Sequence, residues 1–272
     1  MIPTRESPAT DSNTLLVKTE TRDPPSNLTW FRAGRRRRGI VLLGGTSLTD
    51  FRLRVAQSGL RDDLTPSYWS LCGLLLDTKG TFLSVPLQPA EVSSVPRDNA
   101  VQECSLADFD DPDAWPNIAV LSFTREPEAV VRQARLLGRR RSIIDLPELV
   151  LAWLGFAWGV GAAGNPLQAG RGLPSAAYVE TAHALAGVEL TPGLSSSSSC
   201  PEAIWQAVKW WHDYYRETAE VTGGSKSQTI VPRGRYLVRQ RSAQLSLADG
   251  PPSTDPLRPG RRAKRGTTRA RA

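Results

Sequence analysis

Strand-like and helix-like patterns are divided between the two halves of this chain. Short apolar runs typical of buried strands occur at 39–45, 68–76, 81–87 and 117–123. Longer runs with helical periodicity follow at 126–138, 145–159, 172–187 and 200–220. The Lys79-Gly80 pair between two of the strand-like runs favours a hairpin turn. This order predicts an α+β fold in which a small, mostly antiparallel sheet packs against helices.

One helical pattern interrupts the strand-rich half. Leu48, Phe51 and Val55 recur at helical spacing, and Gly59 follows them as a stop signal. We therefore predict a short helix that carries these three side chains along one apolar face.

The positive charge of the chain lies at its ends. Residues 1–38 contain eight basic and four acidic residues, and residues 248–272 contain seven basic and two acidic ones. Because the net charge is +7, the part between them is slightly acidic. We predict a disordered basic segment over 1–37, a folded domain over 38–220 and a mostly disordered basic tail over 221–272. The tails predict weak, unspecific binding of nucleic acid or other acidic polymers, since no aromatic residue is interleaved with the C-terminal arginines.

Cysteine usage favours a reducing compartment. The chain contains three cysteines, Cys72, Cys104 and Cys200, without a CxxC pair, and only two histidines. These numbers argue against a disulfide scaffold and a zinc cage, so we expect no metal or cofactor. The first residues are charged and no apolar segment follows them as in a signal peptide, which predicts a cytoplasmic protein.

Two stretches resemble special segments and are interpreted as ordinary ones. Residues 149–170 carry no charge, but their strongly apolar part is only about half as long as the ~20 residues of a spanning helix. We expect a buried core helix there and no transmembrane segment. Asp110, Asp111 and Asp113 lack the Gly and the distal Glu of a calcium loop, and this predicts a solvated loop.

The order of the motifs resembles that of the circularly permuted papain-like cysteine hydrolases, relatives of NlpC-type endopeptidases and lecithin–retinol acyltransferases. "RGIVLLGGTSLTDFRLRVAQS" resembles the opening strand and helix of that family, and "WSLCGLLLD" resembles the strand that carries its catalytic His. "GLPSAAYVETAHALAGVEL" is similar to the helix that starts with its catalytic Cys. The resemblance implies a permuted papain-like fold with a groove between sheet and helix.

The departures from that family fall on its catalytic positions. The resemblance places Leu71 at the His position and Ser175 at the Cys position. The third polar group of the family corresponds to Ser84. The resemblance further implies that Leu71 and Ser175 face one another across the groove. Cys72 would then face away from Leu71, because alternate residues of a strand point to opposite sides.

Neither remaining nucleophile has an evident base in the sequence. A serine at a helix start needs a hydrogen-bonded base, and Leu71 has no lone pair to act as one. His183 follows Ser175 by eight residues on the same predicted helix, about 12 Å along its axis. Cys200 begins the last helix after a five-serine loop. His183, on the preceding predicted helix, is the candidate base for its thiol.

These observations favour a catalytically inactive member of the family that binds a peptide, acyl or cell-wall-like ligand or a protein partner. One alternative is a divergent hydrolase that uses Ser175 or Cys200 with a recruited histidine such as His183. The second alternative is the tail-driven binding of nucleic acid or acidic surfaces. Trp205, Trp210 and Trp211 enrich the last helix in aromatic residues, and this surface is a candidate site for a protein partner.

Overall fold

The structure is a computed structural model that describes residues 25–34, 38–87, 100–122, 126–139, 145–161, 163–221 and 235–239, with backbone only at 215–221 and 235–239. Its helices are α1 (Asn27–Ala33), α2 (Leu48–Ala56), α3 (Pro127–Arg139), α4 (Leu146–Trp158), α5 (Pro174–Leu185) and α6 (Pro201–Val221). Its strands are β1 (Gly39–Gly44), β2 (Leu71–Leu75), β3 (Thr81–Ser84), β4 (Gln102–Ser105), β5 (Asn117–Ser122) and β6 (Arg235–Arg239).

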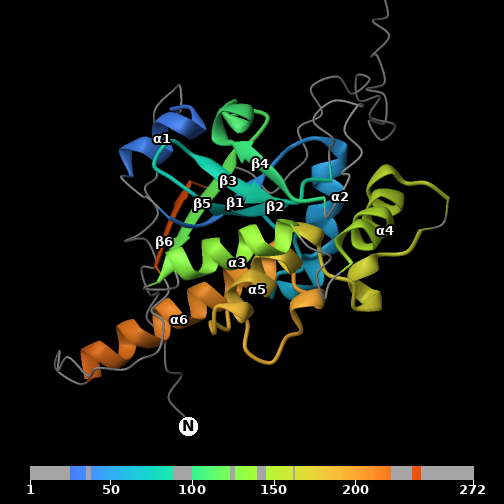
Figure 1. Cartoon of the computed structure of the whole chain (residues 1–272). Coiled ribbons are helices and arrows are strands. Elements are labelled where there is room, and N and C mark those ends of the chain that lie inside the picture. Colours follow the sequence, from blue (N-terminus) through green and yellow to red (C-terminus); the bar gives the residue numbers. More distant parts are fainter. Residues whose placement is uncertain are drawn as a thin grey trace, which may run out of the picture.

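The six strands form one antiparallel sheet in the order β4-β3-β2-β1-β5-β6. Figure 1 shows this sheet with helices packed against it, which confirms the predicted α+β class and the antiparallel sheet. The central strand β1 pairs with β2, which is close in sequence, and with β5, which is distant.

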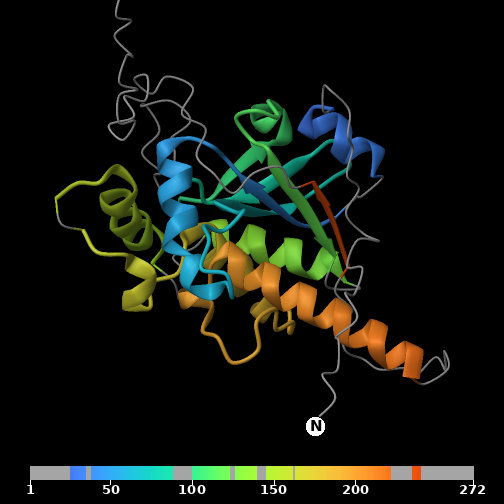
Figure 2. The same cartoon turned by 180° about the vertical axis from the view of Figure 1, so that it is seen from behind.

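Alternate residues of the strands feed two separate cores, one on each face of the sheet. On one face, Ile40, Leu42 and Cys72 pack with α5 and its neighbouring helices. On the other face, Val41, Leu43 and Leu71 pack against α1 and the short 3₁₀ helix Leu106–Phe109. Figures 1 and 2 show α1 on one side of the sheet and α3, α5 and α6 on the other.

The β2–β3 hairpin follows from its turn residues. The Asp77 carboxylate accepts hydrogen bonds from the backbone N–H groups of Lys79, Gly80 and Thr81, at 2.9–3.0 Å. Gly80 has a φ of +94°, a conformation that a residue with a side chain rarely adopts. The hairpin predicted around Lys79-Gly80 is confirmed.

The folded domain begins earlier than the predicted residue 38. Within the segment predicted to be disordered, α1 buries Trp30 and Phe31 in the second core. Ser26 caps the helix by accepting the Thr29 N–H. The Leu28 N–H also donates to the Asp110 carboxylate at 2.6 Å. Residues 1–24, 35–37, 222–234 and 240–272 lie outside the described residues. The domain also extends beyond the predicted residue 220, because β6, within the tail predicted to be mostly disordered, pairs with β5.

Two predicted helices expose apolar side chains that were expected to be buried. On α2, Leu48 and Val55 face solvent. The buried residues are instead Asp50, Leu53, Arg54 and Ala56. The buried face is therefore shifted by one residue from the predicted one. Asp50 and Arg54 lie on this face because their side chains bond to buried polar groups.

The helix α4 was predicted to be a buried core helix, and only one stripe of it is buried. Trp153 and Ala157 pack in the first core, whereas Leu151 is 71% and Trp158 55% exposed. Figure 1 shows α4 at the periphery of the molecule, so only its inner face has neighbours. None of the helices in the described ranges is both long and apolar enough to cross a membrane.

Candidate site at the start of α5

A cavity of about 290 Å³ opens beside the first turn of α5. Its walls come from α2, β2, β4, the end of β3 and the segment that precedes α5. Half of the lining residues are apolar: Leu53, Leu71, Val85, Pro86, Leu87, Phe109, Trp115 and Leu173. The polar lining residues are Thr49, Asp50, Ser70, Gln102, Glu103, Asp108 and Ser175, so the cavity suits a ligand with both apolar and polar parts.

The Ser175 side chain lies at the sheet-facing start of α5. Pro174 occupies the first helical turn, where its fixed φ and missing N–H are tolerated. Ser175 is only 1% exposed, and its Oγ accepts the Cys72 backbone N–H at 3.4 Å. The Sγ of Cys72 lies 3.7 Å from the same oxygen. The predicted position of Ser175 at a helix start beside the strand is therefore found.

The residue in contact with Ser175 is Cys72, which corrects the expectation for Leu71. Leu71 borders the same cavity, but its side chain packs in the second core, on the sheet face away from α5. Cys72 faces α5, as alternation along β2 requires. Cys72 and Leu71 do point to opposite sides, as predicted, but the one that meets α5 is the cysteine.

Ser84 lies close to the same place. It is fully buried on β3, and its Oγ donates to the Cys72 carbonyl oxygen at 2.6 Å. Ser175 and Ser84, two of the three predicted site residues, therefore both hydrogen-bond to Cys72.

Among the described residues, neither Ser175 nor Ser84 is hydrogen-bonded to a side chain that could act as a base. Burial raises the pKa of the Cys72 thiol far above its usual value, and the hydrogen bond with Ser175 offsets only part of this effect. The thiol therefore stays protonated at neutral pH, and a protonated thiol cannot take the Ser175 proton. Within the described part of the chain, no imidazole or carboxylate bonds to Ser175.

Cys200 and His183 also do not form a pair of nucleophile and base in the described structure. Cys200 is fully buried at the start of α6, and burial raises its pKa to about 12. The Nδ1 of His183 lies 2.8 Å from the Val179 carbonyl oxygen, one turn earlier on α5. Burial lowers the pKa of His183 to about 4. Since His183 bonds to its own helix, the described structure does not join it to either candidate nucleophile.

Sequence reasoning missed a buried acid at the cavity wall. Asp50 accepts hydrogen bonds from Ser47 Oγ at 2.5 Å and Ser70 Oγ at 2.7 Å. Arg54, fully buried one turn later on α2, donates to the carbonyl oxygens of Ser67 and Gly45. Burial lowers the pKa of Arg54, and the nearby Asp50 charge opposes this shift. The sequence signal for this buried polar group was the presence of Asp50 and Arg54 within a predicted apolar helix.

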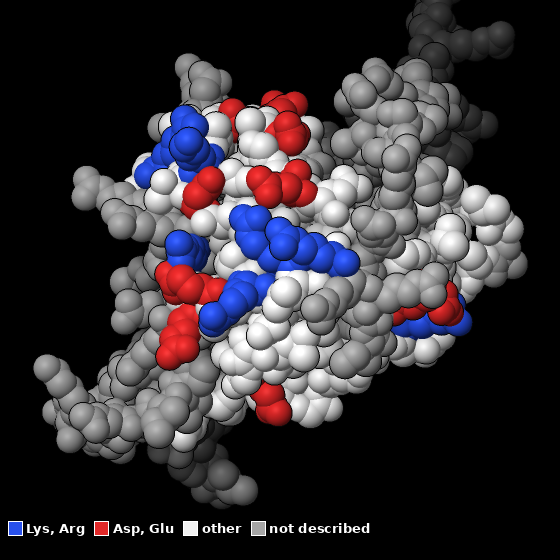
Figure 3. Space-filling view, in the orientation of Figure 1, with Lys and Arg blue, Asp and Glu red and all other residues white. Residues whose placement is uncertain are grey.

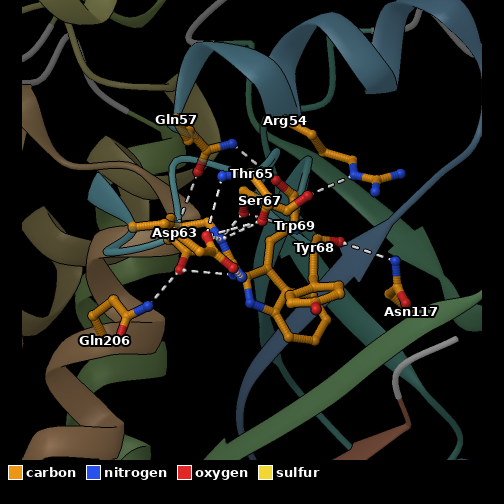
Figure 4. Close-up of polar contacts among 11 residues, drawn as sticks. Arg54, Gln57, Asp63, Thr65, Ser67, Tyr68, Trp69, Asn117 and Gln206 are labelled. Atoms are coloured by element: carbon orange, nitrogen blue, oxygen red, sulfur yellow. Dashed lines mark hydrogen bonds and ion pairs between the residues drawn. The ribbon is translucent and has the colours of Figure 1, made fainter. Parts of the chain in front are cut away.

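A second buried acid, Glu202, joins α6 to the loop after α2. Its carboxylate accepts hydrogen bonds from Ser67 Oγ and Gln206 Nε2, each at 2.6 Å. Its backbone N–H donates to Gln57 Oε1 at 2.9 Å, and Gln57 Nε2 donates to the Trp69 carbonyl oxygen at 2.8 Å. Figure 4 shows Gln57, Ser67 and Gln206 converging from three segments of the chain. These bonds lock elements together rather than present groups to a ligand.

The acidic loop at 110–113 has a structural role. Asp110 binds the start of α1 through its carboxylate and its carbonyl oxygen. The Asp111 carboxylate accepts the Asp113 N–H at 2.8 Å. Across the ranges that the structure describes, no group of three His, Cys, Asp or Glu side chains is arranged to hold a metal.

The aromatic helix α6 has one packed and one open face. Ile204 and Val208 are buried, and Trp205 packs edge-on against Trp69. Trp210 is 57% exposed and stacks on Tyr214, with 5.3 Å between the ring centroids. The partner suggested for this helix stays a prediction.

Comparison with models of known protein families, with curated proteins and with solved structures finds no match for this chain.

Proposed function

We propose that this chain is an α+β domain without hydrolytic activity that binds a peptide or acyl ligand in the cavity at the start of α5. The observation that carries the proposal is the environment of Ser175. Its hydroxyl meets a backbone N–H and a protonated thiol instead of a base.

The polar end of the cavity favours a ligand with an acceptor oxygen. The Ser175 Oγ accepts the Cys72 N–H, so its own hydrogen is available to a ligand carbonyl. The first N–H groups of a helix have no partner within the helix, and the helix dipole adds partial positive charge there. A peptide or acyl carbonyl would receive hydrogen bonds from this end while its apolar part fills the remaining lining.

A hydrolase at this site would need a base beside Ser175. Leu71 offers none, and His183 is bonded to Val179. Cys200 is buried with a pKa of about 12, so its thiolate is scarce at neutral pH. The inactive ligand-binding domain therefore accounts for these positions better than the divergent hydrolase does.

Two measurements on the full chain test the proposal. The protein is incubated with a fluorophosphonate probe, and we expect no labelling, since Ser175 has no base. Binding of N-acylated di- and tripeptides is then measured by saturation-transfer NMR. The variant Gln102→Trp places a large side chain at the cavity lining and should abolish binding.

Gln168→Trp is the matched control, because Gln168 is exposed and lies outside the cavity lining. This control should bind like the wild type. Fluorophosphonate labelling that is lost in Ser175→Ala would contradict the proposal and favour the hydrolase. Peptide binding that Gln102→Trp leaves intact would exclude this cavity as the binding site.

A further inference from the structure

A second hollow runs along α3, and arginines line it. This groove has a volume of about 440 Å³, and Arg38, Arg132, Arg135 and Arg139 contribute to its walls. Leu76 and Leu136 add an aliphatic surface. It shares no lining residue with the cavity at the start of α5, so the two can be tested separately.

Three of these arginines have no ion-pair partner among the described residues. Arg38 pairs with Glu128. Arg132, Arg135 and Arg139 form neither a hydrogen bond nor an ion pair with any residue in the described ranges. Figure 3 shows basic side chains gathered over α3, with acidic side chains to either side. The groove therefore carries a net positive charge that an anionic partner would neutralise.

The spacing of the arginines suits a chain of phosphates. Positions i, i+3 and i+7 share one face of a helix. At about 1.5 Å per residue, Arg132 to Arg139 span about 10.5 Å along the α3 axis. One nucleic-acid strand carries a charge about every 3.4 Å of helix axis, so this span matches about three phosphates. Guanidinium groups bind phosphate oxygens in a two-pronged geometry.

We infer that the α3 groove binds the phosphodiester backbone of nucleic acid without sequence preference. A linear polymer can lie along a concave groove, whereas a flat anionic membrane would reach only its ridges. None of the described residues that line the groove is aromatic, so they offer nucleobases no stacking surface and recognition is limited to the backbone.

The test measures binding of the full-length protein to fluorescein-labelled 20-mers by polarisation. Duplex DNA, single-stranded DNA and single-stranded RNA are compared between about 50 and 200 mM salt, the range in which phosphate contacts weaken strongly. The groove variant is Arg132→Ala/Arg135→Ala/Arg139→Ala. The control variant, Arg261→Ala/Arg262→Ala/Arg265→Ala, removes the same charge from the basic C-terminal tail.

We expect the wild type to bind with an affinity that falls as salt rises. In the groove variant, the slope of log K against log salt for duplex DNA should become shallower by about 2.7, since each phosphate contact contributes about 0.9. The tail variant should lose less slope than the groove variant. Circular dichroism and thermal unfolding confirm that both variants are folded.

Three results would overturn the inference. One is the absence of nucleic-acid binding by the wild type at 50 mM salt. Another is an equal or larger loss in the tail variant, which would assign binding to the tail. The third is binding to phosphatidylserine-containing vesicles that depends on the groove arginines while nucleic acid is not bound.

Discussion

The Ser175 hydroxyl is held by one neighbour, Cys72, and this neighbour also accepts the Ser84 hydroxyl through its carbonyl oxygen. These bonds fix the position of α5 on β2 and β3 at its first turn. At the scale of single residues, these two hydroxyls join the start of α5 to the sheet.

Ser175→Ala should therefore lower the stability of the protein. The change leaves the buried Cys72 N–H without its acceptor, which should lower the free energy of unfolding by about 1 kcal/mol. Urea unfolding followed by circular dichroism measures this value. The control Ser58→Ala alters an exposed hydroxyl bonded to Val55 and should change stability by less than about 0.5 kcal/mol. Equal effects of the two changes would contradict the assigned role.

His183 should make the protein acid-sensitive. Burial lowers its pKa to about 4, below the ~6.5 of a free imidazole. Between these values the unfolded chain binds more protons than the folded one, so stability falls as the pH is lowered from about 6.5 to about 4. The loss reaches about 3 kcal/mol, since one pKa unit corresponds to 1.36 kcal/mol. His183→Gln should remove this loss while its amide can still donate to the Val179 carbonyl oxygen.

Urea unfolding of wild type and His183→Gln at pH 4.5, 5.5 and 7.5 checks this expectation. Glu180, on the same helix, has a pKa raised by burial, so its contribution to stability is lost as the pH rises above the value of the unfolded carboxyl. This contribution is present in both proteins and cancels in their difference. Parallel pH curves for the two proteins would show that His183 does not titrate as the structure implies.

The residue positions of the site could be predicted, but not the pairing across it. The patterns located Ser175 and Ser84, which lie together at Cys72. Leu71 and Cys72 could not be told apart, because both faces of β2 are buried and both residues are apolar. Alternation assigns a face only where one side of a strand is polar.

At the scale of elements, α6 is fastened to the rest of the fold by Glu202. Glu202→Gln should lower the free energy of unfolding by about 1–3 kcal/mol, because a charged acceptor of the Ser67 and Gln206 donors is lost. The same loss leaves Arg61, 3.6 Å from the carboxylate, without this counter-charge. Urea unfolding gives the value.

Glu148→Gln is the matched control for this change. Glu148 lies 3.9 Å from Arg171, and both side chains are more than half exposed, so the change should be within about 0.5 kcal/mol. An effect of Glu202→Gln no larger than that of the control would mean that the buried carboxylate does not hold α6.

The helix α1 is a stabilising part of the domain. Phe31 is 1% exposed in the second core, so Phe31→Ala should cost about 3–5 kcal/mol. Leu48→Ala on α2, where Leu48 is 56% exposed, should change stability by less than about 0.5 kcal/mol. Thermal or urea unfolding distinguishes the two. A small effect of Phe31→Ala would restore the boundary at residue 38.

Elements with strong local signals were predictable, and short or solvent-facing ones were not. The strands β1, β2, β3 and β5 and the helices α3 to α6 coincide with their sequence patterns. The helix α1 was missed because seven residues in a polar, basic segment give too little periodicity. The exposure of α4 was missed because its composition is apolar on all sides, and composition does not say how many neighbours a helix has.

At the scale of the whole molecule, two of the three thiols lie inside the fold. Cys72 and Cys200 are fully buried, whereas Cys104 is partly buried on the edge strand β4. Burial raises the pKa of Cys104 to about 12, and the Asp108 and Glu103 charges add to this effect. Iodoacetamide should therefore modify Cys104 slowly, and Cys72 and Cys200 only through unfolding.

Mass spectrometry of the alkylated protein measures each thiol at increasing urea concentration. The Cys72 and Cys200 rates should follow the global unfolding curve, and all three thiols should react fully in denaturant. Rapid alkylation of Cys72 in native buffer would instead mean that solvent reaches the thiol beside Ser175 in the folded protein.

The pairing of β1 with two strands so different in sequence distance sets the order in which the chain assembles. The β2–β3 hairpin needs only a tight turn, and β1 joins it across a short loop. The β1–β5 ladder, by contrast, requires the closure of most of the first half of the chain. Refolding should consequently be limited by this late closure and proceed more slowly than in helical proteins dominated by local contacts. Until β5 arrives, one side of β1 is left open to pairing with other molecules.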